Sequence, residues 1–394
     1  MKSIVALMVV AFLSANRFFS KLISVGPIYT AEIFILIAVA NKFKSIYSLL
    51  LKNKFFIVFF LYFMFFLLYD AILNGVSEYS VRRSALFFYF VFPLIILVYR
   101  LEISNVFNKY FVVIPLLTVL VAALSPIGYQ SSMASEFLGV LLVVAVFIKR
   151  KFKHIFITVL SFVVVVSGVL INESLFRTPV FVTFVIVILY LWFMKVESYN
   201  SYYTKYSLYM VIGLLFLISL FTGVLGNLII GLSGLFDSEI IKSIGVGLGG
   251  ELYTTRGTSS GTAETRLFFW TLIVEHAFSD IYILLFGNGF YDSFLDLLAP
   301  ELLFREKELI EPHNSFVSIF YKTGMVGVFL TLLYIYKVFK IQQGCMISRK
   351  TSLPFIIGAF MFAGFEVALE NPHGAILFWF ILLAPLIFVR DGCR

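Results

Sequence analysis

Long runs of apolar residues recur from one end of the chain to the other, and this pattern constrains the fold more than any other feature. The chain has 394 residues, of which 61% are hydrophobic, and its mean hydropathy is +1.01. A soluble core of this size cannot hold so much apolar surface, so the sequence predicts an integral membrane protein. We expect residues 1–394 to form a single all-α, polytopic membrane domain.

A helix needs about 20 apolar residues to cross the hydrocarbon core of a bilayer. By this criterion the sequence predicts about 12 transmembrane helices, and the first is expected to be retained rather than cleaved as a signal peptide. The expected spans lie near residues 3–20, 26–41, 55–74, 84–100, 107–125, 132–148, 154–172, 175–195, 206–231, 314–339, 353–369 and 372–390. One large polar loop, residues 232–312, separates the ninth span from the tenth.

Basic residues are distributed unequally between the two sets of short loops. With the N-terminus in the cytoplasm, sixteen fall in inner loops, namely Lys42, Lys44, Lys52, Lys54, Arg100, Lys109, Lys149, Arg150, Lys151, Lys153, Lys195, Lys205, Lys337, Lys340, Arg349 and Lys350. Five fall in outer loops, namely Arg17, Lys21, Arg82, Arg83 and Arg177. This bias predicts that both termini are cytoplasmic and that the 232–312 loop and His313 lie outside the cytoplasm. It also accounts for the net charge of +8 without a nucleic-acid partner.

The large loop itself divides into parts. Residues 231–263 are rich in Gly, Ser and Thr and are predicted to be irregular. Residues 264–285 predict an amphipathic helix at the membrane surface, with an apolar face formed by Leu267, Trp270, Ile273 and Val274. Gly287-Asn288-Gly289 then breaks the chain, and residues 290–310 predict a second short amphipathic stretch.

A lone imidazole precedes the tenth predicted span. His313 is followed by Asn314 and, after nine further residues, by Gly324 and Gly327. An imidazole titrates near neutral pH and can take a proton from a substrate hydroxyl, while the two glycines permit close helix packing that would fix its position. The alternative for any loop histidine is a structural or solvated role, which is our interpretation of His154 and His276.

Two arginines are candidates for binding an anion near this histidine. Arg177 begins a predicted span at its outer boundary, and Arg266 lies near the start of the predicted loop helix. A guanidinium group binds two phosphate oxygens at once. The alternatives are snorkelling of Arg177 to lipid headgroups and a solvated position for Arg266.

Several motifs of cytoplasmic group-transfer enzymes are absent from the sequence. It has no phosphate-binding glycine loop with its lysine, no paired-aspartate motif for a metal-bound sugar nucleotide and no nucleophile elbow. Cys345 and Cys393 suit neither a disulfide framework nor a metal site. We therefore predict no cofactor and no metal. Glu366, inside the eleventh predicted span, is the main feature that favours a transporter.

The order and spacing of these residues resemble bacterial O-antigen ligases and the related O-antigen polymerases. The resemblance rests on His313-Asn314 with Gly324 and Gly327, on Arg177 at the start of a span, and on Arg266 with Trp270 in a large periplasmic loop. It covers about residues 172–345 in motifs and the whole chain in number of spans. Some polymerases have an arginine followed after ten residues by glycine, which none of Arg177, Arg256, Arg266 and Arg305 matches.

The resemblance implies a metal-independent glycosyltransferase of the GT-C type in the bacterial inner membrane, with a periplasmic active site. Its donor would be an oligosaccharide on undecaprenyl diphosphate. A polymerase would pass this glycan to the next lipid-linked repeat unit, and a ligase would pass it to lipid A–core. Membrane lipids and a chain-length regulator protein would be further partners.

The resemblance also implies roles for particular residues. His313 would be the general base, Arg177 and Arg266 would bind the diphosphate, and Asn314, Gly324, Gly327 and Trp270 would support the site. The polymerase is preferred because the chain is rich in Phe, Tyr, Ile and Lys, as enzymes of O-antigen clusters often are. The ligase remains open, and a lipid-linked glycan flippase is the alternative from another class.

Overall fold

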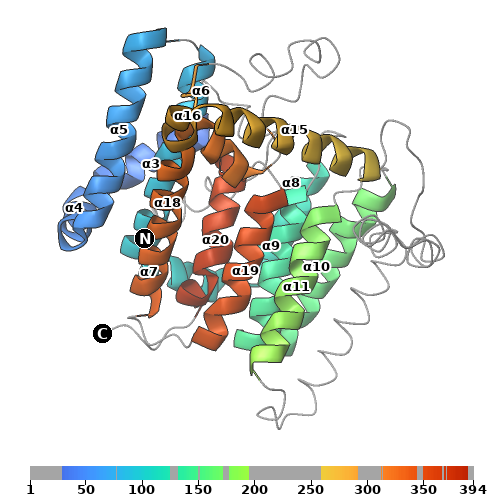
Figure 1. The fold of residues 1–394 in the computed structure, drawn as a ribbon. Helices are drawn as coiled ribbons and strands as arrows, with labels where there is room; N and C mark the ends of the chain where they lie inside the picture. The colour runs from blue at the N-terminus through green and yellow to red at the C-terminus, as the bar shows by residue number, and fades with distance from the viewer. Residues whose placement is uncertain are drawn as a thin grey trace.

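The fold is that of a computed structural model, which describes residues 29–76, 78–124, 132–149, 151–171, 177–194, 259–291, 312, 314–343, 349–365, 368–369 and 371–388. Within these ranges the secondary structure is entirely helical and contains no strand, which confirms the all-α prediction for this part of the chain. Figure 1 shows the helices packed side by side in a bundle, with α15 (Ser259–Ser279) lying across one end. We call this end the upper end.

Two helices are long and apolar enough to cross a membrane, α5 (Lys54–Asn74) and α18 (Ser315–Gln343). Two bent pairs meet the same criteria when each is taken as one span. These are α3 (Thr30–Asn41) with α4 (Phe43–Lys52), bent by 84°, and α6 (Glu78–Phe88) with α7 (Phe92–Tyr110), bent by 41°. The described residues thus contain two to four candidate spans. This number agrees with a membrane protein, and the twelve expected spans stay a prediction.

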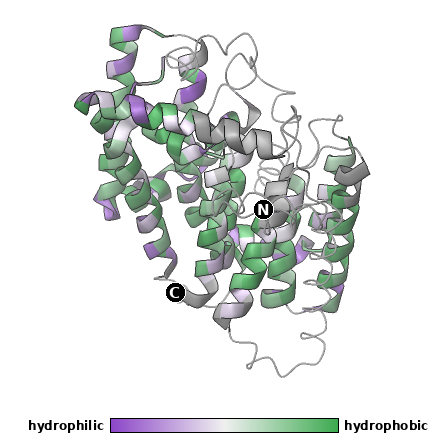
Figure 2. Cartoon of the chain, turned by 45° about the vertical axis from the view of Figure 1, so that its right-hand side comes forward, coloured by the Kyte–Doolittle hydropathy of each residue, from purple (hydrophilic) through white to green (hydrophobic). Residues whose placement is uncertain are grey.

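The remaining helices pack mainly against one another. They are η1 (Tyr89–Val91), α8 (Val113–Leu124), α9 (Ser132–Val143) continued by the π-helix η2 (Val144–Lys149), α10 (Phe152–Ile171), α11 (Arg177–Met194), α16 (Ile281–Phe286), α19 (Arg349–Phe365) and α20 (Pro372–Phe388). Figure 2 shows mainly hydrophobic residues along the helices of the bundle. This distribution is typical of helices that face either lipid or one another.

Several predicted helix positions agree with the structure, and others need correction. The helices expected at 55–74, 132–148, 154–172, 175–195 and 372–390 correspond to α5, α9 with η2, α10, α11 and α20. The helix expected at 84–100 is divided, because α6 ends at Phe88, η1 follows, and α7 continues to Tyr110. The added turns of α7 pack on the bundle through Ser104 and Phe107, which are buried. The helix expected at 107–125 is therefore reduced to α8. The spans expected at 3–20 and 206–231 lie outside the described residues.

Aromatic side chains join α5, at the edge of the bundle, to its neighbouring helices. Phe59 of α5 lies 4.4 Å, centroid to centroid, from Tyr334 of α18, and Phe63 stacks on Phe87 of α6 at 3.7 Å. The hydroxyl of Tyr334 donates to the carbonyl of Phe90. A tyrosine that is buried with its hydroxyl satisfied contributes both apolar area and a fixed orientation. The relative positions of α5, α6 and α18 are thus set by this cluster.

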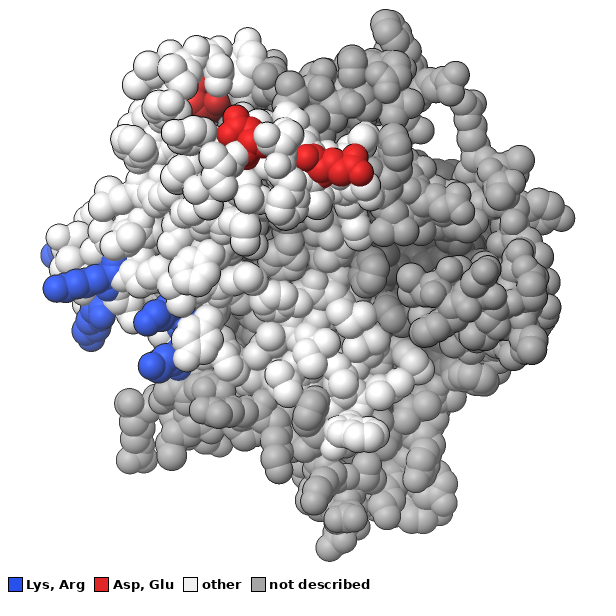
Figure 3. Space-filling view, viewed as in Figure 1, with Lys and Arg blue, Asp and Glu red and all other residues white. Residues whose placement is uncertain are grey.

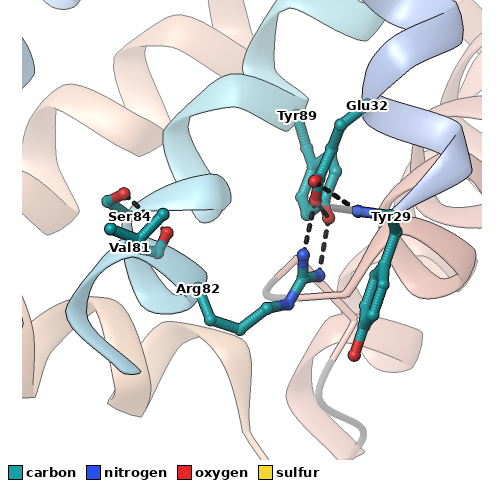
Figure 4. A network of polar contacts seen from close by, with 6 residues as sticks. All are labelled: Tyr29, Glu32, Val81, Arg82, Ser84 and Tyr89. Atoms are coloured by element: carbon teal, nitrogen blue, oxygen red, sulfur yellow. Dashed lines mark hydrogen bonds and ion pairs between the residues drawn. The ribbon is translucent and has the colours of Figure 1, made fainter. Parts of the chain in front are cut away.

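A polar network joins the start of α3 to α6 (Figure 4). The guanidinium of Arg82 lies 2.5 Å from Oε1 of Glu32, donates to the hydroxyl of Tyr89 at 2.7 Å and stacks on the ring of Tyr29 at 3.7 Å. Tyr89 also donates to Glu32. Arg82 and Arg83 were expected in an outer loop, but both belong to α6, and Arg83 is buried. For Arg82, the buried Glu32 provides a charged partner inside the bundle.

Replacing Glu32 with Gln is expected to lower the free energy of unfolding by about 2 kcal/mol, because Arg82 loses its charged partner in a poorly solvated site. Glu102→Gln is the matched control. Glu102 pairs with Lys42 at 3.1 Å, but the two side chains are 34% and 37% exposed, so we expect a loss below about 1 kcal/mol. Thermal unfolding of the purified protein measures both, and equal shifts would contradict a structural role for the Arg82 network.

Candidate functional site

The segments that carry the predicted site residues lie at the upper end of the bundle, where α15 contacts α18. Figure 1 shows α11 and α18 beginning at this end and α15 crossing it. Arg177 is the first residue of α11, and Arg266 lies in α15, one helical turn before Trp270. The side chains of Arg177 and Arg266, and the whole of His313, lie outside the described residues. The described neighbours of these residues therefore define the site.

The start of α18 is fixed by two side chains. Oδ1 of Asn314 accepts hydrogen bonds from the backbone N–H groups of Phe316 at 3.0 Å and Val317 at 3.2 Å, so Asn314 is the N-cap of α18. The buried Ser315 hydroxyl accepts from the N–H groups of Ala368 at 2.8 Å and Leu369 at 3.0 Å. The first turn of α18 is thereby attached to the segment that connects α19 to α20.

Trp270 connects α15 to the residue that precedes His313. Its indole Nε1–H donates to the carbonyl oxygen of Pro312 over 2.7 Å. Pro312 is buried. Together with the Asn314 cap, this bond fixes the backbone on both sides of position 313.

Trp270→Phe is expected to lower the free energy of unfolding by about 1 kcal/mol, because the ring stays apolar while the Pro312 carbonyl loses its donor. The matched control is Trp192→Phe in α11, whose side chain is 78% exposed. That variant is expected to unfold at the wild-type temperature. Circular dichroism during heating measures both, and an equal shift for the two variants would contradict the assigned role of the Trp270–Pro312 bond.

Helix α18 is broken at Gly324, and the Gly-Asn-Gly turn fills the break. Gly324 has φ 63° and ψ −166°, which interrupts the helical hydrogen bonds. The carbonyls of Tyr321 and Lys322 instead accept from the N–H groups of Asn288 at 2.8 Å and Gly289 at 3.0 Å. We call residues 287–290 together with 321–324 the glycine junction.

The backbones in the glycine junction approach too closely for side chains at two positions. A Cβ at Gly324 would collide with the backbone of Leu285 and Phe286, and one at Gly287 would collide with that of Lys322 and Thr323. The sequence predicts that Gly324 permits close helix packing. In the structure the closely packed partner of α18 at Gly324 is α16, together with the turn that follows α16. Gly327 differs, because a Cβ there would meet Thr323 of the same helix.

Two further helices attach to the glycine junction through polar side chains. Asp70, buried near the end of α5, accepts from the N–H of Phe290 at 2.9 Å and from Nδ2 of Asn74 at 2.7 Å. Nε2 of His276 in α15 lies 3.0 Å from Oδ1 of Asn288. The junction therefore links α5, α15, α16 and α18, and His276 is not a simple exposed loop residue.

Two charged residues, Lys322 in the junction and Asp70 in contact with it, were not identified from the sequence. Asp70 and Lys322 are 7% and 0% exposed. Each lies in a predicted span, and a charged residue in a span is by itself a signal of function. Asp70 is the only acidic residue between Glu32 and Glu78, so the signal was present.

The apolar face of α15 is rotated from the predicted one. Phe269, Ile273 and Ala277 are buried, whereas Val274, which was expected on the same face as Ile273, is 40% exposed. The helix also begins at Ser259, so the end of the segment predicted to be irregular is helical. Separately, no cluster of His, Cys, Asp or Glu able to hold a metal ion occurs among the described residues.

Comparisons with protein-family models, with curated proteins and with solved structures found no match. The geometry of the upper end and the chemistry of its residues are therefore the basis for a functional proposal.

Proposed function

We propose that the protein is an inner-membrane glycosyltransferase that polymerises undecaprenyl-diphosphate-linked repeat units of O-antigen or a related surface polysaccharide. The observation that carries the proposal is the bond between Trp270 and the Pro312 carbonyl. It attaches α15, which contains Arg266, to the residue before His313. The proposed base and one proposed diphosphate ligand are thus on segments in direct contact.

The proposed reaction needs a base at the acceptor and cations at the leaving group. The acceptor hydroxyl oxygen attacks the anomeric carbon of the donor glycan, its proton passes to His313, and the bond from the anomeric carbon to the diphosphate oxygen breaks. Arg177 and Arg266 stabilise the charge that develops on the departing undecaprenyl diphosphate. In-line attack inverts the anomeric centre. Positioned cations supply the stabilisation that a metal gives elsewhere.

The distribution of charge supports a periplasmic position for the upper end. In Figure 3, Lys and Arg side chains gather at the left side over α4 and the lower half of α18, and acidic side chains lie higher, over α15 and the neighbouring region of α16. The positive-inside rule assigns the basic end to the cytoplasm. This agrees with the loop-charge prediction, and we propose about 12 spans with both termini cytoplasmic.

A ligase and a flippase would act in the same membrane on the same lipid-linked glycan, but a ligase transfers the glycan whereas a flippase moves it across the membrane. A ligase would use the same base and the same diphosphate ligands with lipid A–core as acceptor. A flippase requires polar groups along a path through mid-membrane. Glu366, the main residue that favours it, lies outside the described residues.

The test is transfer by the purified protein in lipid vesicles that contain a glycan on undecaprenyl diphosphate. A ladder of lengthened lipid-linked glycans supports the polymerase. Transfer only to added lipid A–core would establish the ligase, and donor movement between leaflets without transfer would establish the flippase. In cells, deletion of a polymerase leaves core capped by a single repeat, whereas deletion of a ligase leaves core without repeats.

A further inference from the structure

Helix α4 leaves the bundle direction at a sharp angle. It follows α3 after a bend of 84° at Lys42, although residues 42–54 were expected to form an inner loop. Ile46 is 4% exposed and packs in a cluster with Ile95 and Tyr99 of α7. One side of α4 is therefore held against the bundle, which fixes the direction of the other.

The outward side of α4 carries an apolar stripe. Phe43, Tyr47 and Leu51 follow one another at intervals of four residues and are 60%, 51% and 49% exposed. The rings of Phe43 and Tyr47 stack with centroids 6.0 Å apart. Residues spaced by four share one helix face, so these three form a continuous apolar surface.

Exposed lysines flank this stripe. Lys44, Lys52 and Lys54 are exposed, whereas Lys42 pairs with Glu102 at 3.1 Å and lies over the ring of Tyr99. The sequence contains no acidic residue from position 33 to position 69. Figure 3 shows this basic group at the edge of the molecule, and among the residues described on this face no acidic side chain lies beside it. Glu102 thus offsets the charge of Lys42, and the other three lysines give this surface a net positive charge among the described residues.

We infer that α4 lies in the cytoplasmic interface of the membrane and binds anionic phospholipid headgroups. A ten-residue helix is too short to cross a bilayer, and lysines near both of its ends favour the headgroup region. An exposed apolar stripe flanked by lysines is the pattern of interfacial helices, and the cytoplasmic leaflet supplies the complementary negative charge. This inference requires that the protein lies in a membrane, and it does not depend on the proposed glycosyltransferase activity.

The test compares the affinity of the full-length protein in neutral detergent for phosphatidylglycerol and for phosphatidylcholine, titrated and followed by native mass spectrometry. The variant Lys44→Gln/Lys52→Gln/Lys54→Gln is expected to bind phosphatidylglycerol about fivefold more weakly per lysine removed, with unchanged binding of phosphatidylcholine. The matched control is Lys109→Gln/Lys151→Gln/Lys153→Gln, which removes the same charge from exposed positions outside α4. This control variant is expected to retain most of the preference for phosphatidylglycerol over phosphatidylcholine.

Equal losses in the two triple variants, or no preference for phosphatidylglycerol in the wild type, would overturn the inference. A second measurement tests the position of the stripe. In the variant Tyr47→Trp, the added fluorescence is expected to be quenched by lipids brominated near the headgroup more than by lipids brominated at the chain end. The reverse order would place α4 in the hydrocarbon core and would also overturn the inference.

Discussion

His313→Ala is expected to reduce the rate of glycosyl transfer by about 10²- to 10⁴-fold, the usual contribution of a general base. Without the imidazole, the proton of the acceptor hydroxyl has no acceptor at the moment of attack. The backbone around position 313 is held by Pro312 and by the Asn314 cap, neither of which needs the imidazole. The protein is therefore expected to keep its unfolding temperature. The measurement is the initial rate of glycan lengthening at saturating donor.

The matched control for this experiment is His154→Ala. His154 lies at the start of α10, where its ring packs tilted against that of Phe111 with centroids 4.8 Å apart, in a segment expected on the cytoplasmic side. This variant is expected to transfer glycan at the wild-type rate. If His313→Ala also does so, His313 is not the base. If donor is consumed normally but no glycan is lengthened, the reaction is not polymerisation.

The positions of most helices could be predicted because they depend on the length of apolar runs. Helices α5, α10, α11 and α20 begin and end within a few residues of the expected positions. The break in α18 could not be predicted in the same way. The backbone at Gly324 is set by the turn at Gly287 and Asn288, and a contact between segments so far apart in sequence has no local signal.

The difference between the predicted and the observed buried face of α15 has another cause. In a soluble protein an apolar stripe identifies the buried face, but in a membrane both the packed face and the lipid face are apolar. Val274 and Phe278 are exposed to 40% and 71%, while Phe269 and Ile273 are buried. Hydropathy alone therefore identified the helix and not its orientation. The chemistry of the candidate site stays a prediction, because His313 and the side chains of Arg177 and Arg266 lie outside the described residues. The glycine junction that connects the neighbouring segments required the structure.

Gly324→Ala is expected to lower the free energy of unfolding by about 3 kcal/mol and to abolish most of the transfer activity. Its φ of 63° and ψ of −166° belong to a region that only glycine adopts without strain, which costs about 1–3 kcal/mol for other residues. The new methyl group would also collide with the backbone of Leu285 and Phe286, which cannot move independently of α16. Overpacking of this kind adds about 1–3 kcal/mol. Displacement of α16 from α18 would then shift α15 and, through Trp270, position 313.

Substitutions at two other glycines separate the cost of backbone strain from the cost of the collision with α16. Gly75 has nearly the same backbone conformation, φ 84° and ψ −172°, but no atom lies within 4 Å of its Cβ position, so Gly75→Ala measures the strain alone. Gly364 lies within helix α19, and no atom lies within 4 Å of its Cβ position. Gly364→Ala is therefore expected to be neutral or slightly stabilising. Thermal unfolding and initial rates measured on all three variants should give the order Gly324, Gly75, Gly364 for destabilisation, with loss of activity in Gly324→Ala alone. If Gly75→Ala and Gly324→Ala destabilise equally, the close approach of α16 to α18 contributes nothing, and the glycine junction does not position the site.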